Sequence, residues 1–188
     1  MIDVAEIVAA VAAFDPAGSV RAVESRGRTL ALLRTHARPL DRSSYEPGHV
    51  TASGIVLSPN GAKLLLVFHR RLGRWLQPGG HLDSRDASTI DAARREVIEE
   101  TGVMPDPGVR PLLVSVDVHE IPAARGEPPH LHHDLVYRFV GPLEPPRSSA
   151  EVSQVAWCAI GELDAMGADE PLRRAVARAR SLGAVPPR

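Results

Sequence analysis

The sequence predicts a mixed α/β or α+β sandwich, because helices, strands, a helix, strands and a final helix follow one another along the chain. The chain has 188 residues, of which 44% are hydrophobic, enough for the core of one domain of ordinary size. We find no internal repeat. The formal net charge of −1 lacks the basic excess of a typical nucleic-acid-binding surface, so we expect no nucleic-acid partner.

Two helices are predicted at the N-terminus, over residues 2–14 and 16–36. Ile2, Ala5 and Val8 fall near helical spacing. Asp15-Pro16 is typical of a helix start and places Pro16 at the first position of the second helix. We therefore expect residues 1–45 to form a helical extension that packs on a main domain over residues 46–188.

Strands are expected from residue 50 onward. Residues 50–57 and 62–69 flank the turn sequence Ser58-Pro59-Asn60-Gly61, which predicts a hairpin. Residues 75–77 are expected to be extended and to end at Pro78-Gly79-Gly80. Further strands are predicted over 111–118, 133–140 and 152–158, and a last helix over 169–182.

The clearest helix is predicted over residues 88–101. Ser88 can cap its start, and Asp91 lies three residues later, as in a capping box. Gly102 can end the helix in the left-handed conformation. This helix carries the residues on which the functional interpretation depends.

Three glutamates, Glu96, Glu99 and Glu100, occupy positions i, i+3 and i+4 of this helix. They lie within an arc of about 100°, where like charges repel one another. A hard divalent cation such as Mg²⁺ offsets that repulsion and keeps positions for phosphate oxygens. The alternative is a solvated acidic face, which a bare acidic triplet often is. We expect Ala92 and Ala93 to share the acidic arc and leave it sterically open.

The segment upstream of the helix favours a ligand site over a solvated face. In Pro78-Gly79-Gly80-His81, glycine backbone can approach a ligand closely. Arg95 lies beside the acids and is expected to pair with one of them.

These residues resemble the box of the Nudix (MutT-like) family, which is Gly, five residues, Glu, seven residues, then Arg-Glu-aliphatic-any-Glu-Glu-any-Gly-aliphatic. Residues 95–103, Arg-Glu-Val-Ile-Glu-Glu-Thr-Gly-Val, match the second half completely. Counting back from Arg95 places the upstream Glu position at Ala87 and the Gly position at His81. A one-residue insertion in the loop would let Asp86 replace that Glu and Gly80 match the Gly.

The resemblance implies a Nudix-type α/β/α sandwich with a mixed sheet, and a Mg²⁺-dependent pyrophosphohydrolase in which Mn²⁺ can substitute. The implied substrate is a nucleoside diphosphate linked to another moiety. By resemblance, Glu96, Glu99 and Glu100 are the catalytic and metal-binding acids, joined at the metal by Gly79 or Gly80. Arg95 and Asp86 are implied to be structural partners within the motif. A further acid or base is expected from outside the box, with Glu120, Glu127 and Asp134 as candidates.

Two other functions fit the same resemblance. A non-hydrolytic Nudix module would bind a nucleotide without cleaving it, which the shifted upstream acid leaves open. An isoprenyl diphosphate isomerase would need a cysteine in its site. Cys158, far from the box and late in a strand, is a poor candidate for that role and is more simply a small buried residue.

Histidines are concentrated around His119 and in the segment His130-Leu131-His132-His133-Asp134. Strand alternation places His130 and His132 on one side, with Asp134 in phase. Three interpretations remain open: Zn²⁺ binding through imidazole nitrogens, contact with substrate phosphate or a reacting water, and hydrogen-bonded histidines at a strand edge. His81, which follows the glycines, is a further candidate for substrate contact.

Arg70, Arg71 and Trp75 are further candidates for substrate binding. Arginine donors suit phosphate, and the indole of Trp75 could stack on a base. The alternative, slightly favoured, is a basic turn followed by a core tryptophan.

Cellular context and partners follow from composition. Cys158 is the only cysteine, so an internal disulfide is excluded and a reducing compartment is favoured. No apolar run approaches the roughly 20 residues of a membrane span, and no signal peptide is recognised, so we expect a cytoplasmic protein without a membrane partner. The N-terminal extension could cover the core, shape the substrate pocket or form a homodimer contact.

Overall fold

The computed structural model describes residues 2–70, 72–123, 126–148 and 152–182. Its helices are α1 (Val4–Ala13), α2 (Val20–Thr35), α3 (Thr89–Thr101) and α4 (Glu170–Ser181), with a 3₁₀ turn η1 (Ile160–Glu162). Its strands are β1 (His49–Leu57), β2 (Lys63–His69), β3 (Arg74–Leu76), β4 (Gly79–His81), β5 (Leu112–Ile121), β6 (His130–Val140) and β7 (Val152–Ala159). Among the described helices, none is long and apolar enough to cross a lipid bilayer.

The seven strands form one mixed sheet in which β1 is central and buried along its whole length. The order is β3-β2-β1-β6-β5, with β7 paired to β2 and β4 paired to β1. Strands β1 and β6 run parallel, from His49 opposite His132 to Leu57 opposite Val140. This parallel register joins segments that are about 80 residues apart in the sequence.

The predicted hairpin of β1 and β2 is confirmed only near its turn. The two strands pair antiparallel with Leu57 opposite Leu64. Farther from the turn, β4 pairs with β1, with Thr51 opposite His81 and Ser53 opposite Gly79. The short extended segment after β3 therefore forms a strand of its own.

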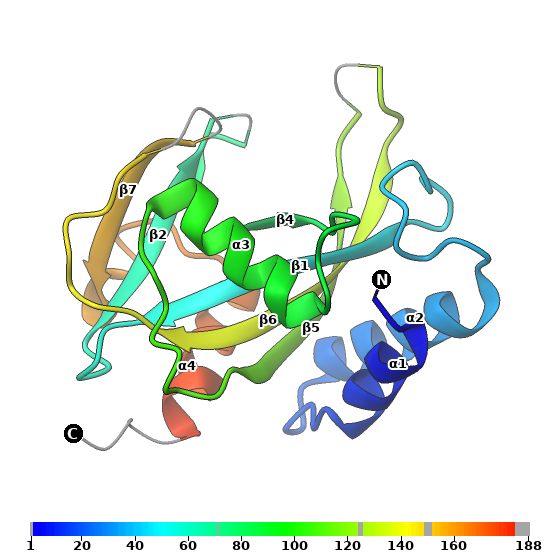
Figure 1. Cartoon of the computed structure of the whole chain (residues 1–188), viewed down its shortest axis with the longest axis horizontal. Coiled ribbons are helices and arrows are strands. Elements are labelled where there is room, and N and C mark those ends of the chain that lie inside the picture. Colours follow the sequence, from blue (N-terminus) through cyan, green and yellow to red (C-terminus); the bar gives the residue numbers. More distant parts are fainter. Residues whose placement is uncertain (1, 71, 124–125, 149–151, 183–188) are drawn as a thin grey trace.

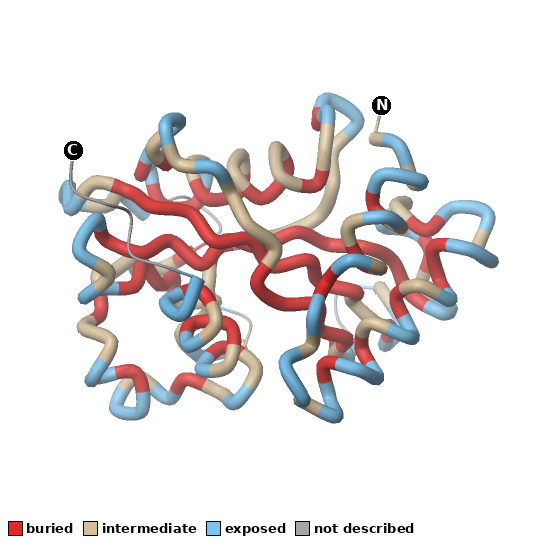
Figure 2. Tube along the Cα trace, turned by 90° about the horizontal axis from the view of Figure 1, so that it is seen from below, coloured by how far each residue is buried: buried red, intermediate tan, exposed pale blue. Residues whose placement is uncertain are grey.

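The sheet separates two hydrophobic clusters, and each is covered by helices (Figure 1). Residues of α1, α2 and α3 pack on one face around Val56, Leu65 and Val97. Residues of α4 pack on the other face around Ile55 and Leu66. Figure 2 shows the buried residues running along the strands, while the helices alternate between buried and exposed positions.

Helix α2 packs against β5, the edge strand of the sheet. The Ser25 hydroxyl accepts a hydrogen bond from the Val118 backbone amide at 3.2 Å. The Thr29 hydroxyl lies 3.1 Å from Nδ1 of His133 in β6. An edge strand otherwise leaves backbone groups open to pairing with another chain, so the Ser25 contact protects part of this edge.

The predicted start of the second helix is wrong. Helix α2 begins at Val20, and Ser19 is its N-cap, accepting a hydrogen bond from the Ala22 amide. Pro16 lies in the preceding turn, where the Asp15 carboxylate accepts from the Ala17 amide. Ala17 and Gly18 have positive φ angles of 49° and 77°, which a right-handed helix excludes, so the helix cannot begin at Pro16.

The caps predicted for α3 are confirmed. The Ser88 hydroxyl accepts from the Asp91 amide at 3.1 Å and donates to the Asp91 carboxylate at 2.8 Å. Gly102 ends the helix in the left-handed conformation, with φ of 67°. The helix therefore has fixed ends, and its orientation over β1 and β4 is set.

Candidate active site on helix α3

The three glutamates of α3 differ in exposure. Glu96 and Glu100 are buried, whereas the side chain of Glu99 is 53% exposed. Ala92 and Ala93 are completely buried in the core, so the expectation that they leave an open surface beside the acids is wrong. The acidic face of the helix overlaps the face that packs on the sheet.

Arg95 lies at the centre of the acidic residues. Its guanidinium donates to both carboxylate oxygens of Asp86, each at 3.0 Å, and to the His81 carbonyl at 2.9 Å. One nitrogen, Nη1, also donates to Glu96 at 2.8 Å and to Glu99 at 3.0 Å. The hydrogen bonds with Asp86 and then with Glu96 raise the pKa of Arg95, which stays charged. Arg95 thus fixes two helix acids relative to the upstream loop.

Strand β4 brings its backbone against the helix acids. The Gly79 amide donates to the Glu100 carboxylate at 3.0 Å. A Cβ placed on Gly80 would lie 2.8–2.9 Å from the atoms of the Glu96 carboxyl group, and one on Gly79 would lie 2.2 Å from the Ser53 hydroxyl. Glycine is needed at both positions because β4 passes between the acids and β1.

Asp134 of β6 is the buried member of the three candidates for an additional acid or base. Its carboxylate accepts hydrogen bonds from the hydroxyls of Ser53, at 2.8 and 2.9 Å, and Thr51, at 3.1 Å. Burial raises the pKa of Asp134. Glu120 is exposed, and Glu127 forms an ion pair with Arg42 at 3.4 Å.

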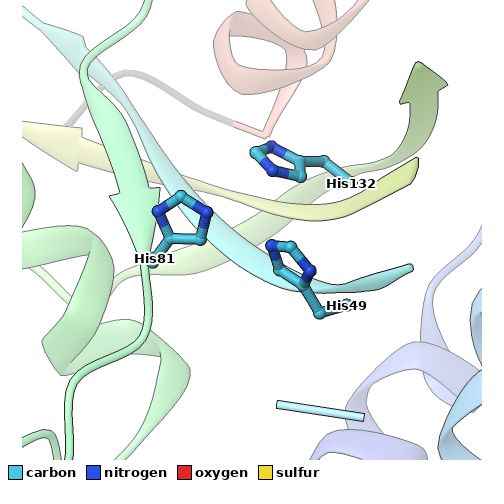
Figure 3. A group of neighbouring side chains, drawn as sticks. All are labelled: His49, His81 and His132. Carbon is cyan, nitrogen blue, oxygen red and sulfur yellow. The ribbon is translucent and has the colours of Figure 1, made fainter. Parts of the chain in front are cut away.

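The histidines gather on the sheet face that carries Asp134. His130 and His132 lie on one side of β6, as predicted, and their Nε2 atoms are 3.3 Å apart. His49 and His81 join His132, with ring centroids 4.9–5.1 Å apart in each pair (Figure 3). Sequence reasoning missed His49, because no motif contains it and the parallel register of β1 and β6 brings it there.

The remaining candidates have other surroundings. Trp75 packs edge-on against Phe68 and against the core on the α4 side, which suits the core interpretation. Arg70 is exposed, and Arg71 lies outside the described residues. Cys158 is buried in the same core, and burial raises the pKa of its thiol.

Known proteins share the sequence pattern and the fold of this chain. The NUDIX domain family profile matches residues 47–179. The chain belongs to the Nudix family. A relative from Citrobacter koseri, the uncharacterized Nudix hydrolase NudL, is 36% identical over 85 residues. That match covers 43% of this chain and 42% of NudL, so it spans less than half of the relative's length.

Solved Nudix structures share the fold. The NUDIX domain of Shewanella oneidensis NrtR, complexed with ADP ribose, has a TM-score of 0.55 and 21% identity, covering 71% of this chain and 86% of that domain. A Nudix hydrolase from Clostridium perfringens has a TM-score of 0.52 and 22% identity. The match covers 72% of this chain and 98% of that chain. The predicted α/β/α Nudix sandwich with an N-terminal helical extension is confirmed.

The Nudix box occupies β4, the following loop and α3. Glu96 and Glu100 offer carboxylate oxygens beside the backbone of Gly80 and Gly79, and the exposed Glu99 lies on the same helix, paired with Arg95. These are the donors that a hard divalent cation prefers. Because Gly80 has no Cβ, its backbone can lie directly against the Glu96 carboxylate. The residues of the box therefore suit Mg²⁺ or Mn²⁺.

Proposed function

We propose that this Nudix hydrolase is a Mg²⁺-dependent pyrophosphohydrolase that cleaves the diphosphate linkage of a nucleoside diphosphate joined to another moiety. The observation that supports this most directly is the contact between the helix acids and β4. Buried Glu100 accepts from the Gly79 amide, and buried Glu96 lies against Gly80. Arg95 holds the Glu96 carboxylate and the Gly79 amide holds that of Glu100, so both lie beside the β4 backbone, where a hard divalent cation can use their oxygens.

Each residue of the box has a proposed part in this reaction. Glu96, Glu99 and Glu100, with the carbonyl of Gly79 or Gly80, would hold Mg²⁺, and Mn²⁺ would substitute. The bound ion would neutralise charge on the diphosphate and make water a better nucleophile. Arg95, held by Asp86, is a positioning residue that sets the orientation of Glu96 and Glu99.

A nearby acid or base would complete the site, and Asp134 is the candidate that the geometry favours. It is buried with a raised pKa, and Ser53, its hydrogen-bond partner, lies opposite Gly79. A carboxyl group with a raised pKa suits proton transfer near neutral pH. Substrate contacts are proposed for His81, His130, His132, Arg70 and Arg71.

The N-terminal residues 1–45 are proposed to be an extension that packs on the domain over residues 46–188. Ile7, Val11 and Leu32 belong to the same hydrophobic cluster as Val97 of α3. Packing of α1 and α2 on that cluster supports a covering role for the extension.

A panel of substrates tests the proposal. The purified protein is incubated with ADP-ribose, dinucleoside polyphosphates, nucleotide sugars and nucleoside triphosphates, with Mg²⁺, Mn²⁺ or EDTA. ADP-ribose is bound to the S. oneidensis neighbour, and another neighbour is a C. elegans Ap4A hydrolase, so the panel includes both classes. Metal-dependent cleavage of one class is expected. Folded protein that binds a nucleotide without cleaving any substrate would instead support the non-hydrolytic module.

A further inference from the structure

Three histidines from three strands meet on the sheet face that points away from α3. His49 opens β1, His81 ends β4 and His132 lies in β6 (Figure 3). Each offers one ring nitrogen, and these nitrogens lie within 4.8 Å of one another. The fold brings them together through two registers, His49 opposite His132 and Thr51 opposite His81.

A glycine makes this approach feasible. Gly48 precedes His49 with φ of 118°, and a Cβ on Gly48 would lie 2.2 Å from the Leu131 carbonyl. A side chain at this position would push β1 away from β6, so Gly48 sets the distance between His49 and His132.

The hydrogen bond of the His49 ring determines which of its two nitrogens can bind a metal ion. Its Nδ1 lies 3.2 Å from the Ser44 carbonyl, which can only accept, so Nδ1 carries the proton. Nε2 then holds a lone pair. Nε2 is buried and has no hydrogen-bond partner among the described residues. A buried acceptor of this kind costs free energy unless it is satisfied, and a metal ion would satisfy it.

His130 orients His132 in the same manner. Nδ1 of His130 lies 2.8 Å from the Pro128 carbonyl and therefore donates to it. Nε2 of His130 is then an acceptor, and it lies 3.3 Å from Nε2 of His132. His132 donates from Nε2 when neutral, which leaves its Nδ1 with a lone pair. Histidine ligands of metals are commonly oriented by such a hydrogen bond from the second ring nitrogen.

The spacing of the three rings fits one shared ion. Three imidazoles that bind one Zn²⁺ at about 2.0–2.1 Å in tetrahedral geometry place their ring centroids roughly 5 Å apart. The three observed separations are 4.9, 5.1 and 5.1 Å.

We propose that His49, His81 and His132 form a binding site for Zn²⁺ or a similar transition-metal ion, separate from the oxygen ligands on α3. Imidazole nitrogen suits Zn²⁺, Co²⁺ and Ni²⁺, whereas Mg²⁺ prefers carboxylate and carbonyl oxygen. Three protein ligands leave a fourth position for water, as in catalytic zinc sites. His81 directly follows Gly80 in β4 and points to the opposite face, so this ion would lie across the sheet from the acids of α3.

Metal titration of EDTA-treated protein tests this site without reference to hydrolysis. Co²⁺ is added first because its visible absorption distinguishes tetrahedral from octahedral sites, and Zn²⁺ is then used to displace it. We expect one equivalent of tetrahedral Co²⁺, displaced by one equivalent of Zn²⁺. X-ray absorption of the zinc-loaded wild type should show three imidazole nitrogens at about 2.0–2.1 Å.

Variants then assign the ligands. His81→Asn and His132→Asn should abolish the tetrahedral signal, and His130→Ala should weaken binding about 10- to 100-fold. His36→Asn, at the C-cap of α2, and Glu99→Gln, on α3, are the controls and should retain it. Circular dichroism checks that each variant is folded.

Three outcomes would overturn the proposal. The first is that wild-type protein binds no tetrahedral ion, as the absorption and X-ray data would show. The signal could persist in both folded variants, His81→Asn and His132→Asn. It could also vanish in Glu99→Gln, which would assign the ion to the helix acids.

Discussion

Asp86 accepts two hydrogen bonds from Arg95, from Nε to Oδ1 and from Nη2 to Oδ2, both at 3.0 Å. The carboxylate side chain is only 4% exposed. This paired geometry fixes the guanidinium plane, which also contacts Glu96 and Glu99. The loop before α3 is thereby connected to the helix acids through a single arginine.

Asp86→Ala should lower both stability and turnover. Removing one partner of a buried ion pair costs about 3–5 kcal/mol, and the lower end is expected because Glu96 and Glu99 still compensate Arg95. Turnover should fall because those acids lose their fixed partner. Urea denaturation and a hydrolysis assay measure the two effects. Asp164→Ala, which removes a carboxylate that is 84% exposed and paired with Arg173, should change both much less. Equal effects of the two variants would contradict the role of Asp86.

Gly80→Ala should reduce activity more than stability. The new Cβ would meet the flexible end of Glu96 at 2.8–2.9 Å, so the carboxylate must move while the backbone can stay. Steady-state kinetics and thermal unfolding measure the two effects. Gly27→Ala is the matched control, because it lies within α2 with nothing within 4 Å of its Cβ. That control should keep full activity and gain up to about 1 kcal/mol of stability. Unchanged turnover in Gly80→Ala would argue against the placement of Glu96 at the reacting centre.

Leu32→Ala tests the packing of the N-terminal extension. Leu32 is 2% exposed and belongs to the cluster beneath α3, so truncation should cost about 2–5 kcal/mol of unfolding free energy. Val23→Ala in the same helix removes a side chain that is 52% exposed and should cost far less. Denaturant titration compares them. A small cost for Leu32→Ala would indicate that α2 contributes little to the core.

Asp117 is expected to stabilise the fold in a pH-dependent way. Burial opposes its ionisation, but hydrogen bonds from His119 and Arg21 outweigh that and lower the pKa of Asp117 to about 2. Because this lies below the unfolded value of about 3.9, the ionised form adds stability above that value and loses it as pH falls toward 2. Unfolding free energies of the wild type and Asp117→Asn should therefore differ most above about pH 4 and converge in acid. A difference that grows in acid would contradict the assigned direction.

Local sequence patterns predicted most of the elements around the site. The helix over 88–101 followed from its caps and spacing, and its acids followed from a motif within one helix. Counting along the loop with one inserted residue singled out Asp86 as the counterpart of the upstream Glu, and Asp86 is a partner of Arg95 in the structure. These features depend on neighbours close in sequence, which is why a single chain reveals them.

Long-range register explains most of what was missed. His49 belongs to no motif and meets His132 only because β1 and β6 run parallel. Helical spacing placed Ala92 beside the acids but could not show that β1 and β4 cover that face. The start of α2 was misplaced because Asp15 forms a turn while Ser19 supplies the cap.

The central claim is that the carboxylates of α3 hold the metal ion needed for cleavage. The most direct test is turnover of the best panel substrate as a function of Mg²⁺ concentration, for the wild type, Glu100→Gln and the control Glu162→Gln in η1. The wild type and the control should show saturable Mg²⁺ dependence. Glu100→Gln should lose about 100-fold or more, since metal stabilisation of the transition state is worth several kcal/mol. Equal turnover in folded Glu100→Gln, or turnover that persists in EDTA, would contradict the claim.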